Sequence, residues 1–106
     1  MNEYSLITTT TNDINSAKKI AKLLIENRLA ACVQLIPIES IYSWQNKINE
    51  EKEVTLLIKS KTDLFEKIKT VIMENHDYEV PQIIQIPITN GLPQYLNWIE
   101  DNVIQA

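Results

Sequence analysis

The stretch from Leu29 to Lys61 constrains the fold most, because it predicts one long β-hairpin. Two segments rich in β-branched and aromatic residues flank a polar middle, the first over 30–44 and the second over about 52–59. No glycine lies between them, so we expect the turn near Gln45 to Asn49, with Asn46 at positive φ. The other segments must pack around this hairpin.

The length of the hairpin implies contact with another chain. An arm of fifteen residues would span roughly 50 Å, whereas a sixteen-residue helix packed on it would cover only about 24 Å. The distal half therefore projects beyond the helices, yet it still carries Ile41, Tyr42 and Trp44. Exposed apolar residues on a strand edge favour a second chain, and Pro37, which cannot donate to a ladder, marks an edge, a bend or a bulge. We therefore predict an oligomer.

The composition fits a single domain over residues 1–106 and argues against two classes of partner. The net charge is -4 and Arg28 is the only arginine, whereas binding to nucleic acid or to acidic membranes needs a basic surface. Cys32 is the only cysteine, so no internal disulfide can form, which fits a reducing, cytoplasmic compartment. We expect no signal peptide and no membrane span, because no basic region precedes an apolar run and no apolar stretch approaches ~18 residues.

The segment before the hairpin predicts a strand followed by a helix. β-Branched and aromatic residues over 4–10 indicate the strand, and the polar run TTTTND ends it. Asn12 or Asp13 can cap the helix that follows. Apolar residues then recur at three- and four-residue spacings, which gives one apolar face with lysines on the outer side. We expect this helix to end near Asn27 or Arg28.

The segment after the hairpin predicts a second helix, a fourth strand and a last helix. Thr62 or Asp63 can cap the second helix, and the segment 75–81 is a connection. The strand over 82–88 is apolar on both parities, so we expect it to be covered on both faces. Pro93 fits the first turn of the last helix. This order predicts an α+β fold: a ferredoxin-like split βαβ sandwich with a long protruding hairpin and an extra C-terminal helix.

Four segments together carry a family resemblance: LAACVQLIPIESIYSWQNKI, EVTLLIKS, HDYEVPQIIQIPI and GLPQYLNWI. In combination they resemble the CutA family of divalent-cation tolerance proteins, over nearly the whole chain. The resemblance implies a PII-like domain that assembles as a homotrimer through long β-strands, with Ile41, Tyr42 and Trp44 at the trimer interface. It also implies a cytoplasmic protein linked to tolerance of copper and other divalent metal ions.

His76, the only histidine, is the first candidate ligand for a metal ion. Imidazole is the commonest transition-metal ligand, and the nearby carboxylates of Asp77 and Glu79 can assist it. The alternative is a surface or capping histidine at the end of the second helix. Some members of the family carry two further ligands that this chain lacks, because Asn75 replaces a second histidine and Thr9 replaces a cysteine. Asp77 also stands where members usually carry proline.

The second candidate site is a cleft between subunits, which the resemblance places beside the end of a neighbour's hairpin. Its residues would be Lys59, Tyr78, Glu79, Tyr95 and Trp98. Such a group can bind a small anion, a metabolite or a protein partner, as in a PII-like sensor or scaffold. The alternative is that Lys59 and Glu79 form an ion pair while the aromatic residues fill the interface.

The remaining polar residues suggest no further site. Cys32 lies beside alanine and valine, so we predict that it packs in the core rather than binding copper. Glu50, Glu51 and Glu53 predict a solvated strand edge, with weak binding of divalent cations as the alternative. No nucleophile elbow, glycine-rich phosphate loop or HExxH motif occurs. The sequence therefore predicts a binding protein and no enzyme. The resemblance implies copper or another divalent cation as its ligand, and we expect no organic cofactor.

Overall fold

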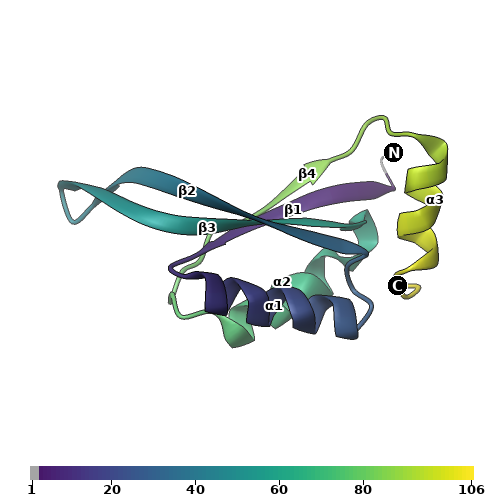
Figure 1. Ribbon diagram of the computed structural model, residues 1–106, viewed down its shortest axis with the longest axis horizontal. Coiled ribbons are helices and arrows are strands. Elements are labelled where there is room, and N and C mark those ends of the chain that lie inside the picture. Colours follow the sequence, from purple (N-terminus) through teal and green to yellow (C-terminus); the bar gives the residue numbers. More distant parts are fainter. Residues whose placement is uncertain (1–2) are drawn as a thin grey trace.

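The computed structural model describes residues 3–106 as an α+β fold with one four-stranded antiparallel sheet (Figure 1). The sheet has the strand order β2-β3-β1-β4, so the hairpin forms one edge and the short last strand forms the other. Two helices, α1 and α2, lie together on one face, and α3 lies beside one end of the sheet (Figure 1). The elements are β1 Tyr4–Thr11, α1 Ile14–Glu26, β2 Cys32–Trp44, β3 Lys47–Lys61, α2 Phe65–Asn75, β4 Ile83–Pro87 and α3 Pro93–Asp101.

The hairpin is longer and its turn is tighter than the sequence predicts. β2 and β3 stay paired from Cys32 opposite Lys59 to Trp44 opposite Lys47, and only Gln45 and Asn46 form the turn. Both turn residues have positive φ, 52° and 61°, as a tight hairpin turn with the twist of the strands requires. The predicted positive φ at Asn46 is therefore confirmed. The predictions of a turn that reaches Asn49 and of a second strand limited to 52–59 are wrong. The main-chain ladder continues through polar residues, because pairing needs no apolar side chain.

The hairpin projects past both helices (Figure 1), and the molecule measures 44 Å along its longest axis. The exposed fractions of Ile41, Tyr42 and Trp44 are 69%, 38% and 61%. The sequence prediction that these side chains project beyond the helical layer is confirmed. Pro37 lies in the edge strand β2, opposite Val54. An edge strand suits proline, because its missing backbone N–H then breaks no ladder hydrogen bond on the outer side.

Helix α1 begins and ends with local hydrogen bonds that its sequence supplies. Asp13 is the cap, and its Oδ1 accepts from the Ser16 N–H at 2.7 Å. At the other end Arg28 takes the left-handed conformation, with φ 54°, and the Leu29 N–H donates to the Leu24 carbonyl at 2.9 Å. This reversal turns the chain back toward the sheet and leads into β2.

Helix α2 begins without the side-chain cap that Thr62 or Asp63 was expected to provide. A 3-10 turn over Thr62–Leu64 comes first, and in the described chain no side chain caps the helix at Leu64. The Phe65 N–H donates to the Thr62 carbonyl, so the turn itself satisfies a backbone group that a cap would otherwise serve. The Thr62 and Ser5 hydroxyls lie 2.7 Å apart, which ties the turn to β1.

The buried core lies between the sheet and the two helices. It exists because α1 and α2 each present one apolar face at helical spacing, while alternate residues of the strands point toward them. The core side chains are Ile7, Ala17, Ile20, Leu24, Leu29, Ala30, Val54, Leu56, Ile58, Leu64, Ile68, Ile72 and Val103.

The sheet face opposite the helices is largely uncovered in the single chain. Ile84 and Ile86 of β4 are 48% and 44% exposed, whereas Ile83, which points the other way, packs against the core. Within one chain this strand is therefore covered on one face only, and cover of the other face by a neighbouring chain stays a prediction. Tyr42 and Trp44 lie on the same face by strand alternation and register. Apolar side chains thus run along this face from the hairpin to β4.

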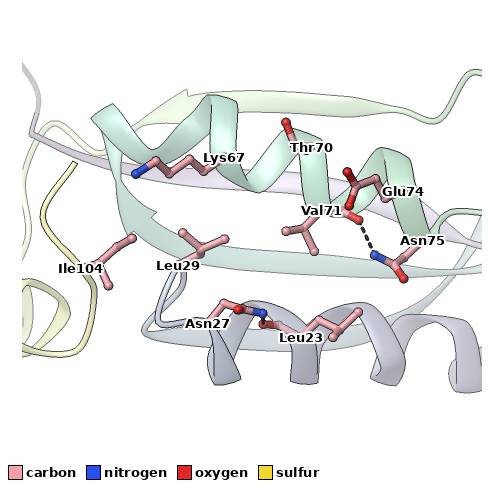
Figure 2. Close-up of a pocket in the computed structure, with 9 residues that line it drawn as sticks. All are labelled: Leu23, Asn27, Leu29, Lys67, Thr70, Val71, Glu74, Asn75 and Ile104. Carbon is pink, nitrogen blue, oxygen red and sulfur yellow. Dashed lines mark hydrogen bonds between the residues drawn. The ribbon is translucent and has the colours of Figure 1, made fainter.

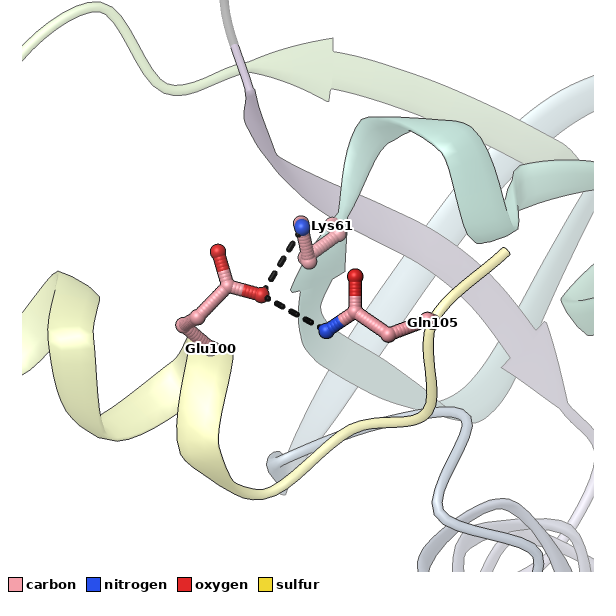
Figure 3. A network of polar contacts seen from close by, with 3 residues as sticks. All are labelled: Lys61, Glu100 and Gln105. Atoms are coloured by element: carbon pink, nitrogen blue, oxygen red, sulfur yellow. Dashed lines mark hydrogen bonds and ion pairs between the residues drawn. The ribbon is translucent and has the colours of Figure 1, made fainter.

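A polar contact joins the end of the sheet to α3 (Figure 3). The Lys61 ammonium donates to Glu100 Oε2 at 2.8 Å, and Gln105 Nε2 donates to the same oxygen at 3.4 Å. The hydrogen bond from Lys61 lowers the pKa of Glu100, and the same bond raises the pKa of Lys61. Gly91 precedes α3 where a Cβ would meet the Leu96 side chain at 3.0 Å, so a side chain there would crowd the helix. Within residues 3–106, every helix is too short or too polar to cross a bilayer.

Candidate functional site

His76 follows the last residue of α2, and both of its ring nitrogens have protein partners. Nε2 lies 2.6 Å from the Thr10 carbonyl oxygen, which can only accept, so Nε2 carries the proton. Nδ1 accepts the Tyr78 N–H at 3.0 Å. These contacts fix the neutral Nε2–H tautomer and occupy the one lone pair that a metal ion could bind. They also join the connection after α2 to the end of β1.

Tyr78 holds this connection against the hairpin. Its hydroxyl donates to Glu53 Oε2 at 3.0 Å, and its ring lies 4.8 Å from the His76 ring at an angle of 49°. Burial, and then the hydrogen bond to the Glu53 carboxylate, raise the pKa of Tyr78 above its usual range. The protonated phenol is therefore the form that bridges the connection to β3.

The two carboxylates predicted to assist His76 do not form a metal-binding group with it in the described part of the single chain. Asp77 is exposed, and its Oδ2 accepts from the Ser16 hydroxyl at 3.2 Å. Glu79 is exposed. Within residues 3–106, no three His, Cys, Asp or Glu side chains come close enough together to hold a metal ion. Thr9 is fully buried, and within the described chain its hydroxyl has no hydrogen-bond partner.

The predicted cleft residues form two separate groups in one chain. The Lys59 ammonium lies 5.3 Å above the Tyr95 ring, which stacks on Trp98 with ring centres 5.6 Å apart. The Tyr78 hydroxyl instead donates a hydrogen bond to Glu53. Glu53 lies six residues, or about 20 Å, from Lys59 along β3. Within the described residues of the single chain, Lys59 and Glu79 form no ion pair, and the pair across a cleft between subunits stays a prediction. In the described residues the ion pairs are Lys61–Glu100 and Lys69–Glu66.

Cys32 is half-buried and lies outside the core, contrary to the sequence prediction. It pairs with Lys59, so its side chain shares the face of Lys59, while the next residue, Val33, pairs with Ile58 on the helical face. Composition indicated burial, but the parity of the strand decides the face. Glu50 and Glu51 are exposed as expected, and the hydrogen bond with Glu51 raises the pKa of Tyr42.

Helices α1 and α2 leave a groove of about 520 Å³ between them, which the sequence did not indicate (Figure 2). Two side-chain amides at its rim are bonded to their own helices. Asn27 Nδ2 donates to the Leu23 carbonyl and Asn75 Nδ2 to the Val71 carbonyl, both at 2.8 Å. The other polar lining residues, Lys67, Thr70 and Glu74, are spaced along α2 (Figure 2), so the groove presents no set of groups that converge on one point.

The chain is similar to proteins named for tolerance of divalent cations. The sequence model of the family described as CutA1 divalent ion tolerance protein matches residues 5–102. The divalent-cation tolerance protein CutA of Thermus thermophilus is 43% identical over 103 residues, which are 96% of this chain and 98% of the relative. The chain covers only 48% of the Arabidopsis thaliana and the mouse CutA proteins, at 39% and 45% identity.

Solved structures show the same fold. The CutA1 structure from the psychrotrophic bacterium Shewanella sp. SIB1 superposes with a TM-score of 0.94 at 43% identity, covering 98% of both chains. The CutA structure from Archaeoglobus fulgidus, described as a periplasmic divalent cation tolerance protein, has a TM-score of 0.93 at 35% identity over 95% of this chain and 99% of that one. The match across almost every element, together with the family model over residues 5–102, shows that this chain belongs to the CutA1 divalent ion tolerance family.

Proposed function

We propose that this chain acts in tolerance of divalent metal ions as a homotrimer that binds copper or another divalent cation, with His76 as a ligand. The observation that carries the proposal is the position of the chain's only imidazole. It is half-buried at the start of a connection that places two exposed carboxylates, Asp77 and Glu79, within three residues of it. Imidazole and carboxylate together suit Cu(II) and Zn(II). Family membership supports the same role.

The uncovered sheet face supports the trimer. Ile84 and Ile86 are half-exposed there, and the hairpin carries Tyr42 and Trp44 on the same side. Contiguous apolar surface of this kind favours burial against other chains. The strand order β2-β3-β1-β4, with α1 and α2 on one face, supports a ferredoxin-like split βαβ unit over residues 1–106. In a trimer each subunit can bring further ligands to a neighbour's His76.

Removal of the imidazole tests the metal site. His76→Ala is expected to weaken copper binding at least about tenfold, because it deletes the chain's only imidazole. Isothermal titration of the chelator-stripped protein with Cu(II) measures the effect. Glu74→Gln is the matched control, since it removes a nearby carboxylate from α2 without touching the imidazole. Equal affinity in wild type and His76→Ala would overturn the assignment of His76.

A second candidate function is the binding of a small anion in the cleft between subunits. The observation that favours it is Lys59, whose ammonium faces aromatic rings rather than a carboxylate. A cation on an aromatic platform can take up phosphate or carboxylate groups. Lys59→Ala is expected to abolish thermal stabilisation by phosphate, citrate or nucleotide anions, whereas Lys52→Ala, on an exposed part of the same strand, should retain it. Melting curves that no anion shifts would remove this candidate.

We also propose a role that involves binding without catalysis, and a cytoplasmic location. The lone cysteine, Cys32, supports a reducing compartment, since it has no partner for an internal disulfide. The description of the Archaeoglobus fulgidus relative as periplasmic makes fractionation of cells followed by immunodetection the direct test. Recovery with the periplasmic fraction would contradict the proposed location.

A further inference from the structure

We propose that Asn90 and Gly91 form a site of spontaneous covalent modification, at which Asn90 is converted through a cyclic imide to aspartate and isoaspartate. The inference is independent of metal binding. It rests on the order Asn-Gly, on the exposure of both residues, and on the absence, within residues 3–106, of hydrogen bonds that hold the reacting groups.

The chemistry needs only the chain itself and water. The Gly91 main-chain nitrogen, once it has lost its proton to solvent, attacks the side-chain carbonyl carbon of Asn90. The new N–Cγ bond closes a five-membered succinimide as the Cγ–Nδ2 bond breaks, and the amide nitrogen takes up a proton and leaves as ammonia. Water then adds its hydroxyl to either ring carbonyl carbon and its hydrogen to the ring nitrogen. Opening at Cγ gives aspartate, whereas opening at the main-chain carbon gives isoaspartate, whose main chain runs through the side chain.

Gly91 provides an unshielded nucleophile. It lies outside helix and strand, in the connection from β4 to α3, which arches away from α1 and α2 (Figure 1). Its φ is not positive, so glycine is needed there for space: a Cβ would meet the Leu96 side chain at 3.0 Å. No side chain at this position can therefore hinder approach to the nitrogen. Within residues 3–106 the Gly91 N–H has no hydrogen-bond acceptor.

Asn90 differs from the other asparagines in its surroundings. Gly91 is the only glycine in the chain, so every other asparagine precedes a residue with a side chain. In a helix the main-chain nitrogen is also held by an i to i−4 hydrogen bond. Four other side-chain amides donate to main-chain carbonyls, those of Asn27, Asn49, Asn75 and Asn102. The Asn90 amide has no hydrogen-bond partner in the described part of the chain.

The isoaspartate product is expected to strain the start of α3. The connection is fixed at both ends, because the Ile88 N–H donates to the Tyr4 carbonyl at 3.0 Å and the Leu92 carbonyl accepts the Tyr95 N–H at 2.9 Å. Isoaspartate inserts one extra main-chain carbon between these two anchors, whereas aspartate adds only a charge. Tyr95, whose ring faces Lys59, lies in the first turn of α3 and should be displaced with it.

The test is incubation of the intact protein in mildly alkaline buffer, followed by peptide mapping with mass spectrometry. We expect the peptide that contains Asn90 to gain the mass difference between water and ammonia, and to become a substrate for an isoaspartyl methyltransferase added as a probe. The rate should rise with pH, because the nucleophile is the deprotonated nitrogen.

Asn12 is the internal control for the rate. It is also exposed and lies outside helix and strand, but Asp13 follows it. We expect Asn90 to react at least about tenfold faster than Asn12, because a Cβ on the attacking residue raises the barrier to ring closure.

Three variants locate the reaction and its effect. Asn90→Gln keeps an amide that can close only a six-membered ring, and Gly91→Ala adds a Cβ beside the nucleophile, so both should keep their amide through the incubation. Asn90→Asp carries the new charge without the extra carbon. We expect amide hydrogen exchange in α3 to be faster in the purified isoaspartate form than in wild type, and unchanged in Asn90→Asp.

The outcomes decide the inference without reference to copper. Conversion of the folded wild type that is absent from Asn90→Gln would support it. Retention of the Asn90 amide in the folded protein would overturn it, whether or not protein unfolded in urea reacts. Equal rates at Asn90 and Asn12 would overturn it as well. Equal hydrogen exchange in wild type, Asn90→Asp and the isoaspartate form would refute the expected strain on α3.

Discussion

The double substitution Ile84→Asp with Ile86→Asp is expected to turn the proposed trimer into monomers. Both side chains lie on β4 on the uncovered sheet face, at 48% and 44% exposure in the single chain. Their burial against neighbouring subunits would stabilise the assembly, whereas two carboxylates per chain would have to be buried unpaired at a cost of several kcal/mol each. The monomer already exposes these positions, so its own core should remain intact. Sedimentation equilibrium measures the change.

The control for this experiment is Ile14→Asp with Ile25→Asp. These two isoleucines are each 42% exposed, but they lie on α1 in the helical layer, away from the proposed interface. We expect the control to keep three times the 12.3 kDa mass of one chain. Loss of assembly in both variants would reflect general destabilisation, and a retained trimer in the β4 variant would show that another surface assembles the protein.

Ile20→Ala is expected to lower the free energy of unfolding by about 2–5 kcal/mol. Ile20 is fully buried in α1 and belongs to the core between helices and sheet, so truncation leaves a cavity as well as losing buried apolar area. Urea unfolding measures the loss. Protein concentration must be the same in every sample, because dissociation of an oligomer couples to unfolding.

Ile25→Ala is the matched control for that experiment. It makes the same chemical change on the same helix, so the gain in helix propensity is equal in both variants. Ile25 is 42% exposed, and its truncation should cost less than half as much. Equal losses for Ile20 and Ile25 would contradict the placement of the core.

The sequence predicted the order of elements and the α+β class, because periodicity records which side of each element is buried. The apolar faces of α1 and α2 and the alternation of β3 are local patterns, and they match the core. The predicted element boundaries were wrong where the backbone pairing or turn geometry does not follow the local sequence pattern. β3 continues through polar residues to Lys47, and the 3-10 turn at Thr62 replaces a cap. Cys32 lies off the core because strand parity, rather than composition, sets its direction.

The candidate site was predictable only as a set of residue types. His76 could be named because it is the only histidine, but its partners could not. Thr10 is 66 positions away and Glu53 is 25 positions from Tyr78, so these contacts depend on the packing of α2 and its connection against two strands. Lys59 and Glu79, one alternative for the cleft, form no ion pair within the described residues of the single chain.

Native mass spectrometry of the chelator-stripped protein, before and after addition of Cu(II), tests the central claim most directly. We predict a trimer that takes up the same whole number of copper ions in every molecule, and a His76→Ala trimer that does not. A monomer, a trimer that stays free of copper, or a ragged series of adducts unchanged by His76→Ala would contradict a trimeric protein that binds metal ions through this histidine.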